Sequence, residues 1–485
     1  MTDPRSSARS RPWPDYRAVW RWHFYAGLLC IPFVVFLSIT GAIYLFKPQI
    51  EAAIDHGVNH RPEAQIHAPS EAVGVALKAH PSWTLHAYQL PTGPSAAAQI
   101  ILGRDGAERR VIVDRADLSI LRDTREDLQP MKLISRLHGE LLLGDRGSNL
   151  VELAASWAIV LIISGLYLWW PRSTVGMAGV FYPRLNAGSR LFLRDLHAVT
   201  AVWVSAFTLF ILVTGLPWAK NWGSYLKEVR KLTGTAVAVQ DWPTGRSSEI
   251  AANRARDHAM AGMSATEVNG HHDHAGSGQR HEGGGGRRRR DVVLSADQLK
   301  GLDRAAPTVD RLQLAYPVLI SPPTRHGGAW TAKSDAANRT LRQDLTLDAA
   351  TGAVLTHKTF ADRHIIDRMV GTGVSLHEGQ FFGWPNQLLN LLVATGLSTA
   401  AVSAAVLWWR RRASGVLGAP LPKGRARFSI GLLAIVLLLA VLLPEFGVSL
   451  IAVLATERIV FRNIPPVASW LGLNRANAAP MESRT

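Results

Sequence analysis

The chain has 485 residues, a formal net charge of +16 and one cysteine. A single cysteine excludes disulfides within the chain, and it excludes cysteine-ligated zinc and iron–sulfur sites. Covalent c-type haem is excluded as well, because no Cys-x-x-Cys-His motif occurs. The apolar residues are gathered into runs of the roughly 20 residues that a helix needs to cross a bilayer. The composition therefore predicts a polytopic, mainly α-helical membrane protein.

Five apolar runs follow a basic tail, 1–19, that we expect in the cytoplasm. The first run is too long for a signal-peptide core and lacks a small-residue cleavage site, so we interpret it as an uncleaved anchor. The last run holds Pro444 and Glu445, so it is either one kinked helix or two shorter segments, with 456–485 as a C-terminal tail. The predicted spans are 20–46, 150–170, 194–218, 386–409 and 428–455.

Arginine in the short connections predicts the orientation. The connections 171–193 and 410–427 are rich in arginine and lysine, so both belong in the cytoplasm with the N-terminus. The long segments 47–149 and 219–385 are then periplasmic. Much of the net charge lies in these anchoring loops, so membrane lipid accounts for it and no nucleic-acid partner is needed.

Each long outer segment has strand and turn patterns, and we expect a small α+β domain in each. Short β-branched runs flank turn-like sequences such as Asp348-Ala-Ala-Thr-Gly352. The second segment also holds a His/Gly/Arg-rich insert, 246–290, whose low apolar content predicts a mobile loop. Its residues His271, His272 and His274 are a possible accessory metal site, with solvated low-complexity sequence as the alternative.

Two histidine-bearing blocks recur at matched spacing, which predicts a two-fold internal repeat. His138 lies in Leu-His-Gly-Glu and precedes Trp169-Trp170 by 31 residues. His377 lies in Leu-His-Glu-Gly and precedes Trp408-Trp409 by the same 31 residues. The tryptophan pairs are best interpreted as aromatic-belt anchors at the cytoplasmic interface.

A second pair of histidines has its own matched spacing. His23 and His197 each stand 18 residues before a Thr-Gly pair, at Thr40 and Thr214. Eighteen residues are five helical turns, so both histidines are predicted near the cytoplasmic surface on helices that can face each other. Two imidazoles approaching from opposite sides are what six-coordinate haem iron requires.

His138 and His377 are predicted on the opposite side of the membrane. A continuous helix from His138 to Trp169 would be about 46 Å long, more than a bilayer needs, so we expect breaks at 144–148 and 383–385. The four histidines are then candidate iron ligands for two b-type haems, paired His23 with His197 and His138 with His377. Arg136 is a candidate partner for a haem propionate. The alternatives are interfacial polar residues and duplication without haem.

This combination of two halves, each with a turn of the Asp-x-x-Thr-Gly kind and a Leu-His block before a span ending in Trp-Trp, resembles the PepSY-associated transmembrane family of iron-regulated bacterial inner-membrane proteins. The resemblance covers about residues 18–412. It implies two periplasmic PepSY-like domains on a multi-pass inner-membrane unit. For some members it also implies a b-haem reductase that releases iron from ferric siderophores.

The expected function is therefore a di-haem electron conduit, an oxidoreductase that reduces a periplasmic ferric siderophore or other iron chelate with electrons from a donor outside this chain. One alternative is a non-redox membrane protein whose PepSY-like domains bind a peptide, a protease or a metal. Another is a permease for haem or an iron chelate. No Ser-His-Asp set, Walker loop or Rossmann fingerprint occurs, which argues against a hydrolase, an ATPase or a nicotinamide site.

Overall fold

The computed structural model describes residues 15–56, 66–93, 95–171, 176–235, 294–323, 328–420 and 430–473. The insert 246–290, with His271, His272 and His274, lies outside these residues. The described chain divides into two compact units. The helical unit comprises Met1–Gly41, Arg146–Tyr225 and Leu391–Thr485, and the sheet unit comprises Ala42–Asp145 and Leu226–Asn390.

Within the described residues, four helices are long and apolar enough to cross a membrane: α1 (Tyr16–Leu45), α5 (Asp145–Trp169), α6 (Ser189–Gly215) and α11 (Trp384–Arg411). They coincide with the first four predicted runs, and each begins two to five residues earlier than its run. The earlier starts add polar residues such as Asp145 and Arg190, which continue a helix beyond its apolar stretch.

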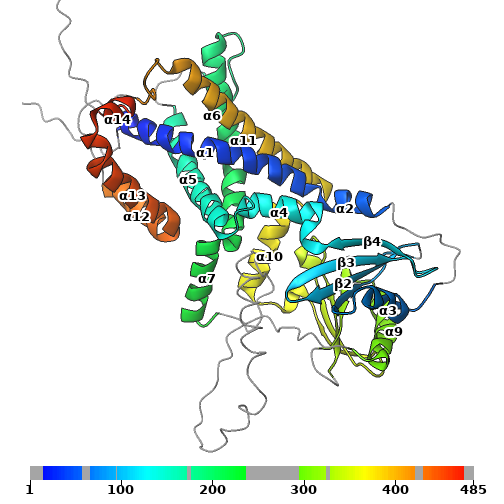
Figure 1. The fold of residues 1–485 in the computed structure, drawn as a ribbon. Helices are drawn as coiled ribbons and strands as arrows, with labels where there is room; N and C mark the ends of the chain where they lie inside the picture. Colours follow the sequence, from blue (N-terminus) through cyan, green and yellow to red (C-terminus); the bar gives the residue numbers. More distant parts are fainter. Residues whose placement is uncertain are drawn as a thin grey trace, which may run out of the picture. The chain divides into compact units, whose positions relative to one another are not determined.

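The fifth predicted run is not a single span. It forms two short helices, α12 (Ile430–Leu442) and α13 (Pro444–Ile459), which lie side by side (Figure 1). Pro444 lacks the N–H that would continue the helix and restricts the residue before it, so the break falls at Leu443. The reversal is sharp, because a Cβ on Gly447 would lie 3.0 Å from the Ala440 carbonyl oxygen. The structure thus agrees with the alternative of two shorter segments for this run.

The two outer segments expected as separate domains share one antiparallel eight-stranded sheet. Its strand order is β4-β3-β2-β1-β5-β6-β7-β8. The seam is the β1–β5 pairing, with Tyr88 opposite Ile320 and Gln89 opposite Leu319. The strands are β1 (Thr84–Gln89), β2 (Ala98–Arg104), β3 (Ala107–Val113), β4 (Ile120–Arg125), β5 (Val318–Ser321), β6 (Trp330–Ser334), β7 (Asp344–Leu347) and β8 (Val354–Lys358).

Two helices, α3 (Pro69–Ala79) and α9 (Ala296–Arg311), cover one face of this sheet and close a single apolar core (Figure 1). Trp330 of β6, 1% exposed, is the largest side chain in that core. Gly301 lets α9 approach it, because a Cβ there would lie 2.5 Å from the Trp330 indole nitrogen. Asp303 of α9 accepts hydrogen bonds from the backbone and hydroxyl of Ser70, which ties the two helices together.

The remaining helices are short and connect these parts. Helix α10 ends at His377, and α4 ends at Glu140 with Leu141 in the left-handed region at φ 50°. The short helices are α2 (Lys47–His56), α4 (Pro130–Glu140), α7 (Lys220–Leu232), α10 (Ile365–His377) and α14 (Pro465–Trp470), with 3₁₀ turns at Glu126–Leu128, Leu216–Trp218, Arg339–Leu341, Phe360–Asp362 and Phe461–Asn463.

One order of elements occurs twice along the chain. A helix, four strands, a 3₁₀ turn, a short helix and a long apolar helix run from α3 to α5. The same elements run again from α9 to α11, with one additional 3₁₀ turn, Arg339–Leu341, between β6 and β7. In the first half the break before the long helix falls at 141–144, a few residues earlier than expected, with positive φ at Leu141, Leu142 and Gly144. In the second half Gly379 and Gly383 take positive φ before α11 begins at Trp384.

Candidate histidine site

The helical unit brings His23 and His197 together. His23 lies two turns into α1 and His197 two turns into α6, and their ring centroids are 6.4 Å apart with an angle of 68° between the planes. Both side chains are half-buried. We call this part of the helical unit the histidine end. The matched 18-residue spacing predicted this encounter, and the structure contains it.

Hydrogen bonds define which nitrogen of His23 carries the proton. Its Nδ1 lies 2.9 Å from Ser164 Oγ on α5. The Ser164 hydroxyl donates to the Leu161 carbonyl oxygen at 3.2 Å, so Oγ is left to accept from His23. His23 Nδ1 is therefore the donor, and its Nε2 keeps the lone pair.

His197 has the same tautomer, and a single hydrogen bond to a backbone carbonyl defines it. Its Nδ1 lies 2.9 Å from the Ala400 carbonyl oxygen on α11, which can only accept. Ser403 donates to that same carbonyl at 3.0 Å. Each histidine thus has a protonated Nδ1 held by the neighbouring helix and an Nε2 that can act as a metal ligand.

The residues that hold the two histidines occupy matched positions. Ser164 precedes Trp169 by five residues, and Ser403 precedes Trp408 by five. The carbonyls that the serines bond, Leu161 and Ala400, belong to the residue three positions earlier in each case. Sequence reasoning missed both serines, although the fixed distance to the tryptophan pair was a signal that could have found them.

The separation of the rings suits two ligands on one metal. Metal–imidazole bonds of about 2 Å on opposite sides of one ion put the two ring centroids roughly 6 Å apart. Among the residues that the structure describes, no group of three or more His, Cys, Asp and Glu side chains could hold a metal ion. Gly165 adds room, since a Cβ there would lie 3.3 Å from the His23 ring.

Two loops close the histidine end. The α5 loop, described from 176 to 188, accepts a hydrogen bond from the Trp169 indole at the Val180 carbonyl, 3.0 Å away. The α11 loop, 412–420, accepts the matching bond from the Trp408 indole at the Leu417 carbonyl, 2.8 Å away. The second tryptophan of each pair is more than 60% exposed, so only that one is available as an interfacial anchor.

A buried carboxylate holds the α5 loop against α6. Asp195, 0% exposed and two residues before His197, accepts from the Arg184 guanidinium at 2.7 and 2.8 Å and from Arg194 at 2.7 Å. The Asp195 carboxylate raises the pKa of Arg184. An acidic residue within an apolar run is costly unless it is paired, and this was the signal that could have identified Asp195.

The other predicted pair, His138 and His377, lies in the sheet unit on the last turns of α4 and α10. Both side chains are half-buried. Each of these histidines therefore lies in the last turn of a short helix that precedes a long apolar helix, α5 after α4 and α11 after α10.

Amide side chains fix the end of α10. Asn390 donates to the carbonyls of Leu376 and His377 at 2.7 and 2.9 Å, and Asn386 donates to Leu376 at 3.0 Å. Both asparagines are more than 90% buried. They satisfy carbonyls that a helix end leaves without partners, so the backbone of His377 is held firmly.

Arg136, the candidate propionate partner, has a buried Nε with no hydrogen-bond partner among the described residues. A buried guanidinium N–H without an acceptor is costly, and an anionic group at that position would satisfy it. His364, by contrast, caps α10 by accepting from the Ile366 backbone at 3.3 Å.

A polar cluster inside the helical unit was not predicted. Glu152 of α5, 2% exposed, accepts from the backbone N–H groups of Asn221 and Trp222 at 2.8 Å each, so it caps the start of α7. The Asn221 side chain donates to Glu445 at the turn between α12 and α13. Trp222 donates to the Leu442 carbonyl at 2.9 Å. The cluster thus anchors the α12–α13 turn.

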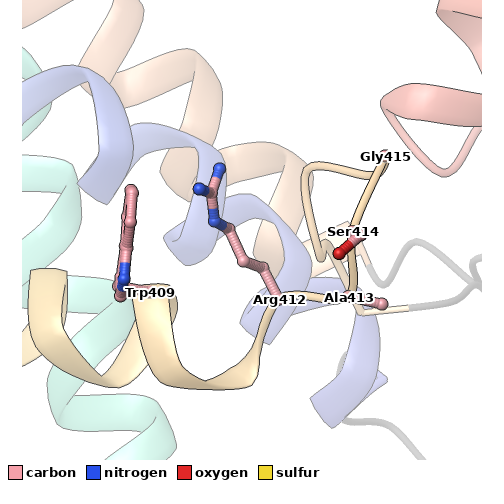
Figure 2. A pocket seen from close by; sticks show the side chains of 5 residues that line it. All are labelled: Trp409, Arg412, Ala413, Ser414 and Gly415. Atoms are coloured by element: carbon pink, nitrogen blue, oxygen red, sulfur yellow. The ribbon is translucent and has the colours of Figure 1, made fainter.

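A shallow hollow of about 330 Å³ lies at the end of α11, lined by Trp409, Arg412, Ala413, Ser414 and Gly415 (Figure 2). The Arg412 guanidinium lies 3.9 Å from the centre of the Trp409 six- and five-membered ring system. An arginine stacked on tryptophan at the end of a span is typical of an interfacial anchor. No histidine lines the hollow, so it is separate from the pair described above.

Comparison with known families covers most of the chain. The sequence matches the family described as PepSY-associated TM region over residues 20–411. No curated protein matches it significantly. The matched region begins inside α1, includes α5, α6 and the four candidate ligand histidines, and ends at the last residue of α11. This protein therefore belongs to the PepSY-associated TM region family.

Proposed function

We propose that this protein is a b-type di-haem oxidoreductase of the bacterial inner membrane that passes electrons outward to a periplasmic ferric siderophore or another ferric chelate. The observation that carries the proposal is the His23–His197 pair. Both rings have a protonated Nδ1 fixed by a neighbouring helix, and their spacing of 6.4 Å suits one ion between two Nε2 atoms.

His23 and His197 would hold one haem, and His138 and His377 the other, with Arg136 directed to a propionate. When bound, haem supplies one-electron chemistry between Fe(III) and Fe(II). The residues around the rings limit their freedom: Ser164 and the Ala400 carbonyl orient the first pair, and Asn390 holds the helix end that carries His377.

The membrane orientation is part of the proposal. The arginine-rich connections put the N-terminus and the histidine end on the cytoplasmic side, and the sheet unit on the periplasmic side. Histidines 23 and 197 then lie near the electron donor, and the outer pair lies near the chelate. Transfer of one electron to a ferric chelate favours iron release, because oxygen ligands hold Fe(II) less tightly than Fe(III).

We further propose that the two halves arose by duplication, with the outer segments as PepSY-like domains. The repeated order of elements supports this, and so does a constant separation of 239 residues between His138 and His377, Ser164 and Ser403, and the two tryptophan pairs. In a duplicated protein, the two ligands of each haem come from equivalent positions in the two halves.

The test is the spectrum and haem content of protein purified from haem-replete cells. We expect two haems per chain, a low-spin b-type spectrum and reoxidation of the dithionite-reduced protein by a ferric siderophore. A colourless protein from such cells would contradict the proposal and favour a non-redox binding protein. If the protein contains haem that a ferric chelate does not reoxidise, the proposed cofactor would be supported and the proposed substrate would be contradicted.

A further inference from the structure

The residues on either side of His23 are hydrogen-bonded to the C-terminal part of the chain. Arg21 donates to the carbonyls of Pro420 at 3.0 Å and Gly472 at 2.8 Å. The Tyr25 hydroxyl donates to the Leu471 carbonyl at 2.5 Å. Residues 21 and 25 are one turn apart and share a face of α1, whereas residue 23 points to the opposite face.

The acceptors belong to a short folded segment, 465–473, that we call the C-terminal strap. It consists of α14 and the turn after it, where Leu473 donates back to the Ala468 carbonyl at 2.8 Å. Ala468 is 1% exposed. The strap also accepts a backbone hydrogen bond from Leu417 of the α11 loop at Trp470, 2.9 Å away. Strap, loop and the start of α1 therefore form one connected structure.

The α12–α13 hairpin explains how the strap returns to this place. The chain leaves the α11 loop after Pro420, and Gly472 shares the Arg21 guanidinium with that same residue. A helix of 13 residues is about 20 Å long and one of 16 about 24 Å, so neither is long enough to cross a bilayer of about 30 Å. Because Pro420, before the hairpin, and Gly472, after it, both bind the Arg21 guanidinium, the hairpin enters and leaves the membrane on the same face.

The turn of the hairpin is held inside the helical unit. Leu443 and Phe446, both buried, pack on Ile159 of α5 and on Leu216 in the 3₁₀ turn after α6. Trp157 donates to Ser449 at 3.0 Å, in addition to the bonds of Glu445 and Leu442 described above. With its turn anchored in the membrane and its ends anchored at α1, the hairpin cannot slide along the helices.

We infer that α12 and α13 form a re-entrant hairpin, and that the strap it delivers is a clamp that positions His23 by holding the opposite face of α1. The role assigned to His23 rests on the proposed function, whereas the return of the chain to one face does not. The matched family region ends at residue 411, so the clamp is an addition that lies beyond it.

The first test concerns the side of the strap. Cys30 is the only cysteine, so a Cys30→Ala background accepts single probes. Ser414→Cys in the α11 loop and Ser469→Cys in the strap should react with a membrane-impermeant maleimide on the same side, and Asp105→Cys in the β2–β3 turn on the other. Reaction of the residue 414 and 469 probes on opposite sides would overturn the re-entrant hairpin.

The second test concerns the clamp. In the full-length haem protein, Tyr25→Phe should raise the rate at which the inner haem transfers to apomyoglobin by about two- to tenfold, the range expected for one hydrogen bond. Arg21→Gln removes the donor of two hydrogen bonds and should raise that rate by at least as much. The outer haem should leave at the wild-type rate. Arg17→Gln removes one charge from the same helix, one turn before Arg21, and should change neither rate. Arg21→Lys should restore part of the retention.

The outcomes separate the two proposals. Equal rates for wild type, Tyr25→Phe and Arg21→Gln would reject the clamp while leaving the haem assignment intact. Acceleration of both haems together would show general destabilisation and would also reject it. Wild-type protein without an inner haem would reject the proposed function, and the labelling result would still decide the topology.

Discussion

The two loops at the histidine end are each held by a charged helix residue, and the two residues have opposite charges. Asp195 and Arg21 each stand two residues before a histidine. Asp195 holds the α5 loop through arginine side chains, whereas Arg21 holds the α11 loop and the C-terminal strap through backbone carbonyls. Positions in the two halves can therefore be recognised as equivalent by the loop that each residue binds, even when one residue is an acid and the other a base.

The largest expected effect tests whether the two histidines act as one unit despite these different surroundings. His23→Ala and His197→Ala should each remove the same haem or convert it to high spin, because six-coordinate ligation fails when either imidazole is lost. The double variant should be no worse than either single one. Haem content and spectra measure this, with His138→Ala and His377→Ala as the matched pair for the other haem.

The contrary result is equally clear. If all four single variants kept full low-spin haem and unchanged reduction of a ferric siderophore, the ligand assignment would be wrong and a non-redox role would be the better interpretation.

The residues that hold the two loops should differ in their contribution to the free energy of unfolding, which is a smaller effect than loss of haem. Asp195→Asn removes a fully buried charge that accepts from two arginines, so we expect a loss of about 2 kcal/mol in the free energy of unfolding. Arg21→Gln should cost less, because it removes one charged donor to carbonyls at a half-buried position. Denaturation of the purified protein in detergent, followed by tryptophan fluorescence, compares them. A larger loss for Arg21→Gln would reverse the ranking of the two anchors.

The two serines offer a finer comparison between the halves. Ser164→Ala takes away the acceptor of His23 Nδ1, whereas Ser403→Ala leaves the Ala400 carbonyl bonded to His197. A histidine that loses its Nδ1–H acceptor is a weaker ligand base, which disfavours Fe(III), so the inner potential should rise. A hydrogen bond of about 1 kcal/mol corresponds to a shift on the order of 40 mV for one electron.

Ser403→Ala is the matched control and should shift the potential less. Redox titration of the inner haem decides the point. Equal shifts in the two variants would mean that the serines act on packing and not on the imidazole.

The smallest expected effect lies in a turn of the sheet unit. Asp348 accepts from the Thr351 backbone and hydroxyl, both at 2.8 Å, and these bonds lower the pKa of its carboxyl. A lowered folded-state pKa stabilises the fold above the ordinary pKa of Asp and loses that contribution as the pH falls through the folded value. Asp348→Asn should therefore narrow the difference in melting temperature between pH 6 and pH 3 by a small amount. If the difference in melting temperature is the same in the variant and the wild type, this turn does not contribute to the loss of stability in acid.

Much of the helical unit was accessible from the sequence. The apolar runs located α1, α5, α6 and α11 to within five residues, and the 18-residue spacing identified His23 and His197 as partners. Both signals are local, since hydropathy and helical period depend on neighbouring residues. The break at Pro444 was also anticipated, but the packing of α12 and α13 depends on contacts with α5 and α6.

The rest depended on distant pairings. Nothing near Gln89 indicates that its partner is Leu319, so two separate domains were expected where one sheet occurs. Ser164 and the Glu152 cluster were missed because their partners lie on other helices. Asp195 was missed although its arginine partners lie within 11 residues of it. The periodicity and composition of a sequence predict which face of a helix is apolar, but they do not predict which other helix packs against that face.

The seam between β1 and β5 has a consequence for synthesis of the chain. Translation proceeds at about 5–20 residues per second, so β1 is made tens of seconds before the strand that pairs with it. During that interval the first four strands have an open edge at β1, and α3 lacks Asp303, which accepts from its first turn. Such an edge pairs readily with other chains. The first four strands therefore need protection from aggregation until β5 has been made.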